Sequence, residues 1–404
     1  MSCLIQAREE ETPSTFIPPV WAYHYSYDDL APYRVPDMKK VNENFWYLEL
    51  GGDMDSIRDT EVCRDELLKI AYGVWDYVKN APENKEQNKY WRLSWIGMLP
   101  GKRESRRYVG DHIMVQNELR SGGHFKDMIA YGGWSIDTHH PAGFKTKEKP
   151  TIYHPAPSPY GIPYRVLYSV NIDNLMFAGR NISVTHAVTS SARVMGTCAL
   201  LGQAAGTAAA IAIRNSLSPR GVYEQRMDEL QQNLLEDDCY LPGIPYRVSD
   251  LTSDAVLSGE CENIDNLRDG YNRPIGEEDH GVFLALCSPV TYTFRDAKAI
   301  HRVRLVFDSD LEQDTLPAYE KQLKRGMVCN LTRNFPDTYV PKTMTKGYLI
   351  EGLTEERWIV LAEESNNYLR LRVHDICFTG NAIRFTPKST WGNETCHLFE
   401  FDLK

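Results

Sequence analysis

Apolar and polar residues follow two different periods along the 404-residue chain, and the change falls near residue 241. Upstream of it, the clearest pattern is helical. A helix is expected over about residues 56–78, because its apolar positions lie three or four residues apart and share one face: Cys63, Leu67, Ile70, Val74 and Val78. A polar loop is expected at residues 80–88. Residues 45–52, aromatic and closed by two glycines, are expected to form a strand.

Residues 174–213 predict a strand, a turn and a long helix. The apolar run 175–178 is typical of a buried strand, and Gly179 ends it. A polar turn containing His186 follows, and then a helix from about residue 193 to residue 213. Three hydroxyl residues ahead of this helix are expected to cap its N-terminus: Thr189, Ser190 and Ser191.

The expected long helix carries small residues three or four positions apart: Gly196, Gly202, Ala205, Gly206 and Ala209. A glycine inside a helix costs on the order of 1 kcal/mol relative to alanine, so close approach by another group is the usual compensation. Tight packing of the helix on a sheet is one explanation. The other is a polar or anionic ligand at the helix N-terminus, where free N–H groups and the positive end of the dipole lie.

Downstream of residue 241, short runs alternate with a period of two. Residues 301–307 place Val303, Leu305 and Phe307 on one face. Turn residues separate similar runs at 357–362, 368–373, 382–386 and 398–403, which together predict an antiparallel β-sandwich. Residues 1–45 are rich in Pro and Tyr and predict no regular element.

Charge and composition narrow the class of protein. A formal net charge of −10 argues against nucleic acid and anionic membrane as partners. No apolar run approaches the roughly 20 residues that span a bilayer, and the first residues do not form a signal peptide. The nine cysteines include no C-x-x-C pair, which argues against iron–sulfur, zinc or other metal sites and fits reduced thiols. A cytoplasmic location is expected for this chain as given. If a longer precursor exists, the location is unknown.

Residues 91–114 concentrate positive charge in an otherwise acidic chain. The cations are Arg92, Lys102, Arg103, Arg106 and Arg107, and only Glu104 and Asp111 offset them. Such a segment either faces an anion or carboxylate, or forms structural ion pairs.

Several of these motifs resemble one family. The segments AGRNIS, THAVTSSARVM and GQAAGTAAAIA, within residues 178–212, look like the C-terminal flavin-contacting part of bacterial FAD-dependent oxidoreductases. The similar members are those labelled heterodisulfide reductase-like or xanthan lyase-like. The blocks PGKRESRR (100–107) and AYGGWSIDTHHPAG (130–143) also match, so the resemblance runs from about residue 46 to residue 239.

The resemblance implies an α/β fold, a partial FAD/NAD(P)-binding (glutathione reductase-like) core with a β-rich substrate layer, and FAD as cofactor. Gly179, Arg180 and Asn181 would lie beside the flavin chain. The backbone of Arg193, Val194, Met195 and Gly196 would lie near the pyrimidine edge. Gln203 and Thr207 could reach flavin polar atoms, although both equally suit hydrogen bonds between helix and sheet, and Gly206 is also expected to contact the cofactor.

Oxidation of an alcohol or amine also needs a base near the reacting carbon. His186 is the first candidate and His139, with Asp137 beside it in sequence, is the second, because an imidazole titrates near neutral pH. Each histidine could instead be a structural hydrogen-bonding group. Arg193 and Arg107 could hold the anionic reduced flavin or an anionic substrate group, or could form ordinary ion pairs.

The glycine-rich turn that holds a dinucleotide pyrophosphate, G-x-G-x-x-G, does not occur in this sequence. In the family it lies ahead of the matched region, so the chain looks like the C-terminal part of such an enzyme. The expected domains are an irregular tail of a truncated FAD domain (1–45), a substrate-domain region (46–165), a flavin-contacting segment (166–240) and a galactose-binding-like sandwich (245–404). A partner subunit could supply the missing half, the chain could be a truncated product, or flavin could have been lost.

The function expected from the resemblance is FAD-dependent oxidation of a carbohydrate or polyol. The alternative is a non-catalytic carbohydrate-binding protein or pseudoenzyme without flavin. Nothing in the sequence supplies the apparatus of a polysaccharide lyase, the label that some relatives carry. Tyr368 and Trp391 could stack on a sugar ring, or could pack within or at the edge of the sandwich.

Overall fold

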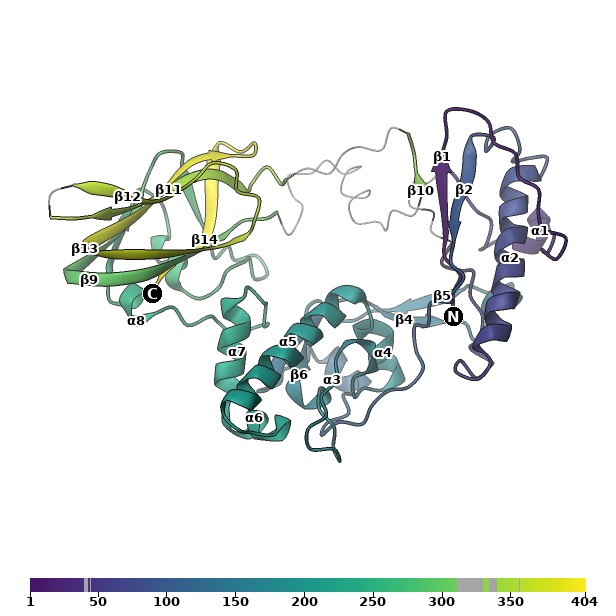
Figure 1. The fold of residues 1–404 in the computed structure, drawn as a ribbon, viewed down its shortest axis with the longest axis horizontal. Coiled ribbons are helices and arrows are strands. Elements are labelled where there is room, and N and C mark those ends of the chain that lie inside the picture. The colour runs from purple at the N-terminus through teal and green to yellow at the C-terminus, as the bar shows by residue number, and fades with distance from the viewer. Residues whose placement is uncertain (40–42, 44, 311–329, 334–339, 356) are drawn as a thin grey trace. The chain divides into compact units, whose positions relative to one another are not determined.

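The computed structural model describes residues 1–39, 43, 45–310, 330–333, 340–355 and 357–404. The chain divides into two compact units, residues 1–231 with 319–336 and residues 232–318 with 337–404. Figure 1 shows helices and small sheets in the first unit and a large sheet in the second. The boundary at residues 231 and 232 falls within helix α7, Met227–Glu236.

Within the described residues, the first unit contains three small sheets. One has the strand order β10-β1-β2, and the others pair β3 with β6 and β4 with β5. Its elements are β1 Ile5–Glu9, α1 Tyr27–Leu30, α2 Thr60–Asn80, β2 Trp91–Ile96, α3 Gln116–Arg120, β3 Met128–Gly132, β4 Ile136–His139, η1 Gly143–Lys145, β5 Thr151–His154, β6 Tyr160–Pro163, η2 Tyr164–Val166, η3 Gly179–Asn181, α4 His186–Ala192, α5 Met195–Arg214, α6 Pro219–Gln225 and β10 Asn330–Leu331.

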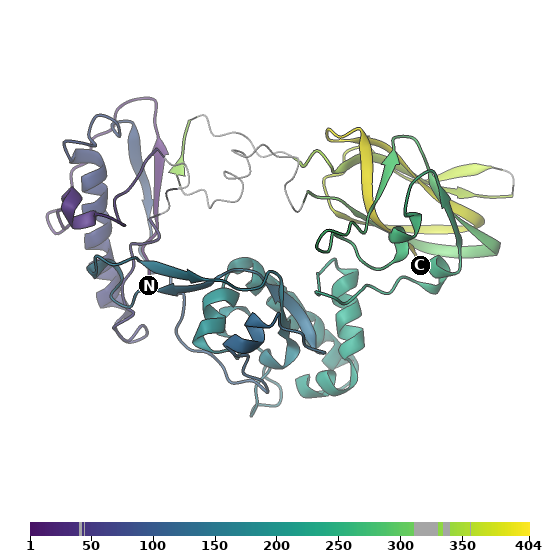
Figure 2. The ribbon, with the colours of Figure 1, turned by 180° about the vertical axis from the view of Figure 1, so that it is seen from behind.

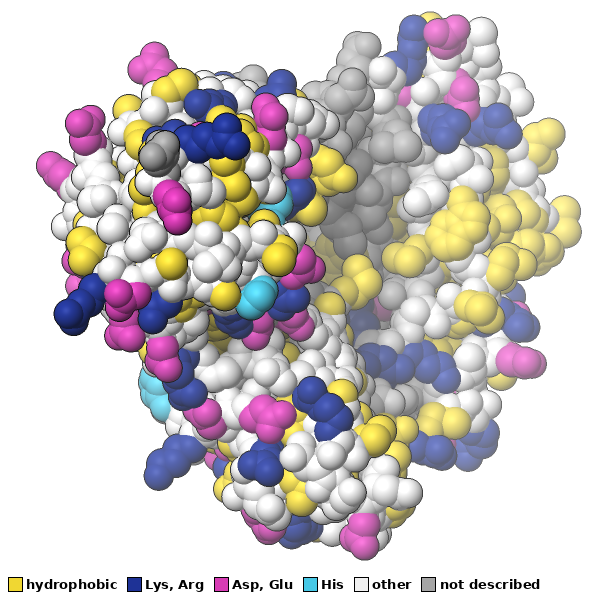
Figure 3. Space-filling model, turned by 60° about the vertical axis from the view of Figure 1, so that its left-hand side comes forward, with side chains coloured by type: hydrophobic (Ala, Val, Ile, Leu, Met, Phe, Trp, Pro, Cys, Tyr) yellow, Lys and Arg dark blue, Asp and Glu magenta, His cyan; other side chains and the backbone are white. Residues whose placement is uncertain are grey.

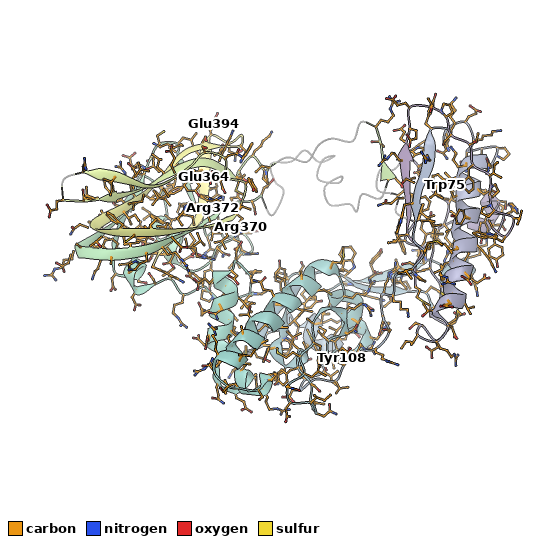
Figure 4. The ribbon with its side chains drawn as sticks, in the orientation of Figure 1. Trp75, Tyr108, Glu364, Arg370, Arg372 and Glu394 are labelled. Carbon is orange, nitrogen blue, oxygen red and sulfur yellow. The ribbon has the colours of Figure 1, made fainter. Side chains whose placement is uncertain are left out.

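Helix α2 buries the stripe that its sequence predicts. The five predicted side chains are at most 3% exposed: Cys63, Leu67, Ile70, Val74 and Val78. They pack in one core with Ile5 and Ala7 of β1 and with Trp75, which Figure 4 labels. The polar loop after the helix is also present, and the buried Lys79 ammonium holds it by donating to the carbonyls of Asn88 (2.9 Å) and Trp91 (2.6 Å). Both predictions are confirmed.

The predicted strand at residues 45–52 is wrong. A turn closes from Leu48 N–H to the Phe45 carbonyl (3.0 Å), and the segment then meets the chain start through separate hydrogen bonds and one bridge, Glu49 to Ser2. A turn at its start leaves too little extended chain for a ladder. Conversely, residues 5–9 form strand β1, paired with β2, where the sequence predicts nothing regular. The alternation of β1 rests on Ile5 and Ala7 alone, which are both buried.

The segment 175–214 also differs from its prediction. The apolar run 175–178 pairs with the described chain only through a bridge between Tyr168 and Met176, so no regular strand forms. The helix is divided in two, α4 and α5, and the three expected cap residues lie inside α4. The Thr189 and Ser190 hydroxyls donate to the carbonyls four residues earlier, at 3.2 and 3.1 Å. Such bonds let hydroxyl residues occupy a helix interior.

In the second unit, seven described strands form one sheet in the order β12-β11-β13-β9-β14-β8, with β7 also paired to β9. All of its pairs are antiparallel. Figure 2 shows this sheet from behind. The elements are α8 Asp250–Ser253, β7 Val256–Gly259, η4 Ile264–Arg268, β8 Val282–Ala285, β9 Val290–Phe307, β11 Thr345–Leu353, β12 Trp358–Glu364, β13 Leu371–Thr390 and β14 Thr395–Leu403.

The expected C-terminal strands are confirmed, and Val303, Leu305 and Phe307 are fully buried in the core. The two separate sheets of a sandwich are replaced by one continuous sheet around that core. Strands β9 and β13 are 18 and 20 residues long, and their ladder shifts register between Asp375 and Phe378. Such irregularities bend long strands, so a single sheet can curve around one core.

The surface of the molecule carries charges of both signs. On the face in Figure 3, acidic and basic side chains are interspersed. In the second unit, Arg372 of β13 pairs with Glu364 at the end of β12 at 2.8 Å, and Figure 4 labels both residues.

Candidate active site

A pocket of about 430 Å³ lies in the first unit, where segments far apart in the sequence meet. Strand β4 contributes Asp137 and His139, α4 begins at His186, and Arg193 directly follows α4. The ionisable side chains of its wall are Glu49, Arg103, Glu104, Arg107, Asp137, His139, His140, His186 and Arg193. The structure therefore brings together the four residues suggested for catalysis, although their roles stay predictions.

His139 lies between two carboxylates. Its Nδ1 is 2.8 Å from Glu49 Oε1, and its Nε2 is 3.0 Å from Asp137 Oδ2. Arg103 pairs with the far side of Glu49, and Arg193 pairs with Asp137 at 2.9 Å. The side chains of Glu49 and Asp137 are only 6% and 9% exposed. The result is a largely buried row of polar groups, in which Arg103 Nη1 also lies 3.0 Å from His139 Nδ1 and Arg193 Nη2 lies 3.3 Å from His139 Nε2.

These contacts shift the pKa values of His139 and Asp137. Burial alone would lower the pKa of His139, but the hydrogen bonds to Asp137 and Glu49 outweigh it and raise the pKa. Burial would raise the pKa of Asp137, but the bonds from His139 and Thr151 lower it. Each ring nitrogen of His139 already lies within hydrogen-bond distance of a carboxylate, so neither nitrogen is open to a substrate proton. His139 suits holding the row together better than accepting a proton.

His186 is placed differently. Its Nδ1 is 2.7 Å from Glu104 Oε2, so Nδ1 carries the hydrogen and Nε2 keeps the lone pair. Partial burial and the neighbouring cations Arg107 and Arg193 lower the pKa of His186, whose side chain is still 66% exposed to solvent. Arg107 also pairs with Glu104. His186 is therefore a neutral imidazole at pH 7, on the wall of the pocket.

Most residues predicted to contact a cofactor form a second group. Gly179, Arg180 and Asn181 make the turn η3, which lies against α5. The other predicted residues lie on α5 or just before it. The exposed ones are Met195, Gly196, Gln203 and Gly206, and the half-buried ones are Val194 and Thr207. Of all these predicted residues, Arg193 is the one that also lines the pocket.

Helix α5 presents an apolar face to solvent. Met195 and Ile213 are 85% and 81% exposed. A β-carbon added at Gly196, Gly202 or Gly206 would meet no atom of the described residues within 4 Å beyond its own helix backbone. The expected tight packing of these glycines on a sheet is therefore wrong. The opposite face of the helix is the buried one, and α5 lies against β3.

Contrary to the sequence expectation, α5 is long and apolar enough to cross a bilayer, by length and composition only, and 33% of its apolar stretch is buried. A core helix of a soluble protein passes the same test. Because one face of α5 is buried against β3, this helix is part of the first unit.

The cationic segment supports both of its interpretations. Arg103 and Arg107 reach the pocket, and each pairs with a carboxylate there. Arg92 lies on β2, with its guanidinium 3.9 Å from Glu10. Glu49 and Glu104, the partners of the two histidines, were not predicted. Glu49 is 90 residues from His139 in the chain, so no local pattern could connect them.

A family model for FAD dependent oxidoreductases matches residues 7–234. The chain belongs to this family. The match contains every pocket residue except Met1, and it also contains turn η3 and helix α5. Both groups of predicted residues therefore lie in the part of the chain shared with FAD dependent oxidoreductases.

No curated protein matches this member of the family. Among solved structures, it is similar to "GH31 CBM32-2 bound to GalNAc", with 13% identity, 37% of this chain and 95% of that chain covered, and a TM-score of 0.27. It is also similar to the family 32 CBM from C. perfringens NanJ in complex with galactose, with 10% identity, 39% and 97% coverage, and a TM-score of 0.26. Scores this low carry no argument about a ligand of this chain.

Proposed function

We propose that the first unit is the flavin-facing and substrate-facing part of an FAD-dependent oxidoreductase that oxidises a carbohydrate or related polyol. The proposal rests on His186, a neutral imidazole on the wall of a pocket within the family-matched region. Bound FAD would supply the two-electron acceptor. His186 would take the proton of the substrate hydroxyl at Nε2, while Glu104 holds the ring through Nδ1.

The exposed side of α5 and the turn at Gly179 fit the flavin end of the cofactor. Gly179 has a φ of +76°, and a β-carbon there would meet no described atom within 4 Å. The backbone is thus open to close approach by a ligand. Gly179, Arg180 and Asn181 would lie beside the flavin chain, and residues 193–196 near its ring. Gln203, Gly206 and Thr207 would line the same side.

The pyrophosphate end of FAD has no glycine-rich cradle in this sequence. We therefore propose that a partner subunit completes the cofactor site and covers the apolar face of α5. The exposed Met195 and Ile213 and the open glycines between them support a protein surface at this place. The matching motifs at residues 100–107 and 130–143 support the heterodisulfide reductase-like and xanthan lyase-like group within the family.

A sugar ligand for the second unit is the second candidate function, and it requires no flavin. The sequence resemblance of its strands to galactose-binding-like sandwiches supports it, as does Tyr368, which is 62% exposed. Trp391 is less suited to stacking. Its Nε1 donates to the Asn367 carbonyl at 2.6 Å, and the Lys346 ammonium lies 4.6 Å from the centre of its ring.

The visible spectrum of the purified protein, with and without added FAD, tests the first proposal. Bands near roughly 370 and 450 nm that stay with the protein through gel filtration are expected if the flavin site forms. The variant Arg214→Gln, at the far end of α5, should bind FAD as the parent does. A folded protein that does not retain FAD, either alone or with its co-purifying partner, would rule out the oxidoreductase and leave the sugar-binding function.

A further inference from the structure

The first unit contains a second pocket, of about 390 Å³, which shares no lining residue with the candidate active site. Its walls come from the chain in and before α1, from α2, and from turn η1 with the two residues that follow it. We call it the tyrosine pocket. It is lined by Tyr23, Tyr25, Asp29, Glu66, Ile70, Phe144, Lys145, Thr146 and Lys147.

The tyrosine pocket has a continuous aromatic wall. The ring centres of Tyr23 and Tyr25 are 6.2 Å apart, and those of Tyr25 and Phe144 are 5.5 Å apart. Tyr23 is 41% exposed, so part of this wall stays open to whatever enters the pocket. Aromatic surface with a few polar groups beside it is the usual lining of a small-molecule site.

The charges around the tyrosine pocket balance. Two carboxylates, Asp29 and Glu66, face two ammonium groups, Lys145 and Lys147. Hydrogen bonds lower the pKa of Asp29 and of Glu66, so both carboxyl groups are ionised at neutral pH. Because neither sign prevails, the pocket favours a neutral ligand over an anion or a cation.

Several hydrogen-bonding groups of this pocket are unused. Among the residues that the structure describes, the Tyr25 hydroxyl and the Lys145 ammonium have no hydrogen-bond or ion-pair partner. Glu66 accepts one bond at each oxygen, from Tyr23 (2.8 Å) and Lys69 (2.7 Å), and a carboxylate oxygen can accept a second. The pocket therefore offers both donors and acceptors beside its aromatic rings.

We infer that the tyrosine pocket binds a neutral sugar ring. A pyranose has an apolar face of C–H groups that can pack on an aromatic ring, and hydroxyls that both donate and accept. A purely apolar ligand would leave the Tyr25 hydroxyl and the Lys145 ammonium without partners. The inference goes beyond the proposed oxidoreductase, because this site requires neither flavin nor His186.

Turn η1 belongs to both pockets. Gly143 lines the candidate active site, and the next residue, Phe144, lines the tyrosine pocket. The Phe144 N–H donates to the Glu49 carbonyl at 2.7 Å, which ties this turn to the wall of the active site. A carbohydrate bound in the tyrosine pocket would therefore be held next to the candidate active site.

Titration of the 404-residue protein with three neutral glycosides tests this inference: methyl β-D-galactopyranoside, methyl β-D-glucopyranoside and methyl α-D-mannopyranoside. Ligand-observed NMR detects the binding and calorimetry measures its affinity. We expect at least one glycoside to bind with a Kd of about 1 mM or lower, as is usual for a ligand of this size. Added sodium chloride should leave this Kd unchanged, because the ligand carries no charge.

Variants locate the site. Tyr25→Phe should weaken binding of the glycoside by about threefold to tenfold, and Lys145→Gln by about tenfold, because each removes one hydrogen-bonding group. Neither group has a partner in the described residues, so both variants should fold as the parent does. Tyr27→Phe is the matched control, since it removes a hydroxyl from an exposed tyrosine outside the pocket. Tyr368→Ala, in the second unit, should also bind as the parent does.

Failure of all three glycosides to bind would overturn the inference, and so would equal affinities in the parent, Tyr25→Phe and Lys145→Gln. Binding that is lost in Tyr368→Ala but kept in both pocket variants would place the sugar on the second unit instead. Failure of the proposed function is a separate result. A protein that binds a glycoside through Tyr25 but never retains FAD keeps the sugar site and loses the oxidoreductase.

Discussion

At the scale of single residues, the partners of a histidine decide whether it can act as a base. His139 and His186 line the same pocket, and each contacts a glutamate. His139 has a carboxylate at each ring nitrogen, which leaves neither nitrogen open, whereas His186 has one at Nδ1 alone. The proton of a substrate hydroxyl can therefore go to Nε2 of His186. His139 instead holds its two carboxylate partners in place.

Replacing His186 with asparagine should slow reduction of bound flavin by about 10²–10⁴-fold, the usual contribution of a general base. The parent rate should stay level through neutral pH and fall only below pH 6.5, because the pKa of His186 is lowered from that value and the base must be deprotonated. Anaerobic stopped-flow bleaching of the flavin between pH 5 and pH 8 measures both effects.

His112→Asn is the matched control. His112 pairs with Glu118 at 3.0 Å, as His186 pairs with Glu104, but it lies outside the pocket wall. Its replacement should leave the rate and the pH profile unchanged. An acid limb that persists in His186→Asn would assign the base to another group.

The residue scale also shows what the sequence could and could not predict. The neighbours Asp137 and His139 lie two positions apart, and their contact follows from an extended strand that places them on one face. The contact of His139 with Glu49 comes from tertiary packing alone. The sequence therefore suggested His139, His186, Arg107 and Arg193, which the structure brings to one pocket, but it could not show that His139 has a carboxylate at both ring nitrogens and His186 at one.

At the scale of elements, prediction succeeded where one face of an element is buried within this chain. Helix α2 and the C-terminal strands meet that condition, and their periods were visible. Helix α5 was predicted too, with packing on a sheet as one of two explanations for its glycines, and the structure leaves these glycines open. A pattern of small residues shows that something approaches closely, but it does not show whether that partner belongs to the same chain.

Gly206→Ala tests separately what residue 206 contributes to the stability of α5 and to the binding of FAD. With no described atom within 4 Å of the new β-carbon, the change should stabilise the protein without flavin by about 0.5–1 kcal/mol, because alanine loses less backbone entropy in a helix. The same methyl group should weaken FAD retention if the cofactor lies on this face. Urea unfolding and FAD titration measure the two effects.

Gly132→Ala is the contrasting variant, because a β-carbon there would lie 2.4 Å from the Tyr160 ring and should destabilise the protein. A destabilised Gly206→Ala would mean that the helix face is already covered in the purified protein. Unchanged FAD retention in a stabilised Gly206→Ala would remove α5 from the cofactor site.

At the scale of the whole molecule, the chain has two units, and the second depends on a buried ion pair of its own. Arg304 of β9 and Glu400 of β14 pair at 1% and 2% side-chain exposure. Arg304 also donates to the last carbonyls of α7, at Leu235 (3.0 Å) and Glu236 (3.1 Å). Burial raises the pKa of Glu400 to about 7, so Arg304 opposes a strong tendency of this carboxyl to take up a proton.

Arg304→Met should therefore destabilise the second unit more at pH 8 than at pH 5. At pH 8 the variant must bury an unpaired carboxylate, at a cost of about 3–5 kcal/mol, whereas at pH 5 Glu400 can be buried protonated. The sign follows because Arg304 lowers the pKa of Glu400, so its removal raises that pKa further above 4.5 and the variant loses more stability than the parent as pH rises. Hydrogen exchange of peptides from β9 and β14 reports this unit by itself.

Arg302→Met, two residues away in an exposed pair with Asp375, should change stability by no more than about 1 kcal/mol at either pH. Equal losses in the two variants, or a loss in Arg304→Met that ignores pH, would mean that Glu400 is protonated and that its pairing with Arg304 contributes little.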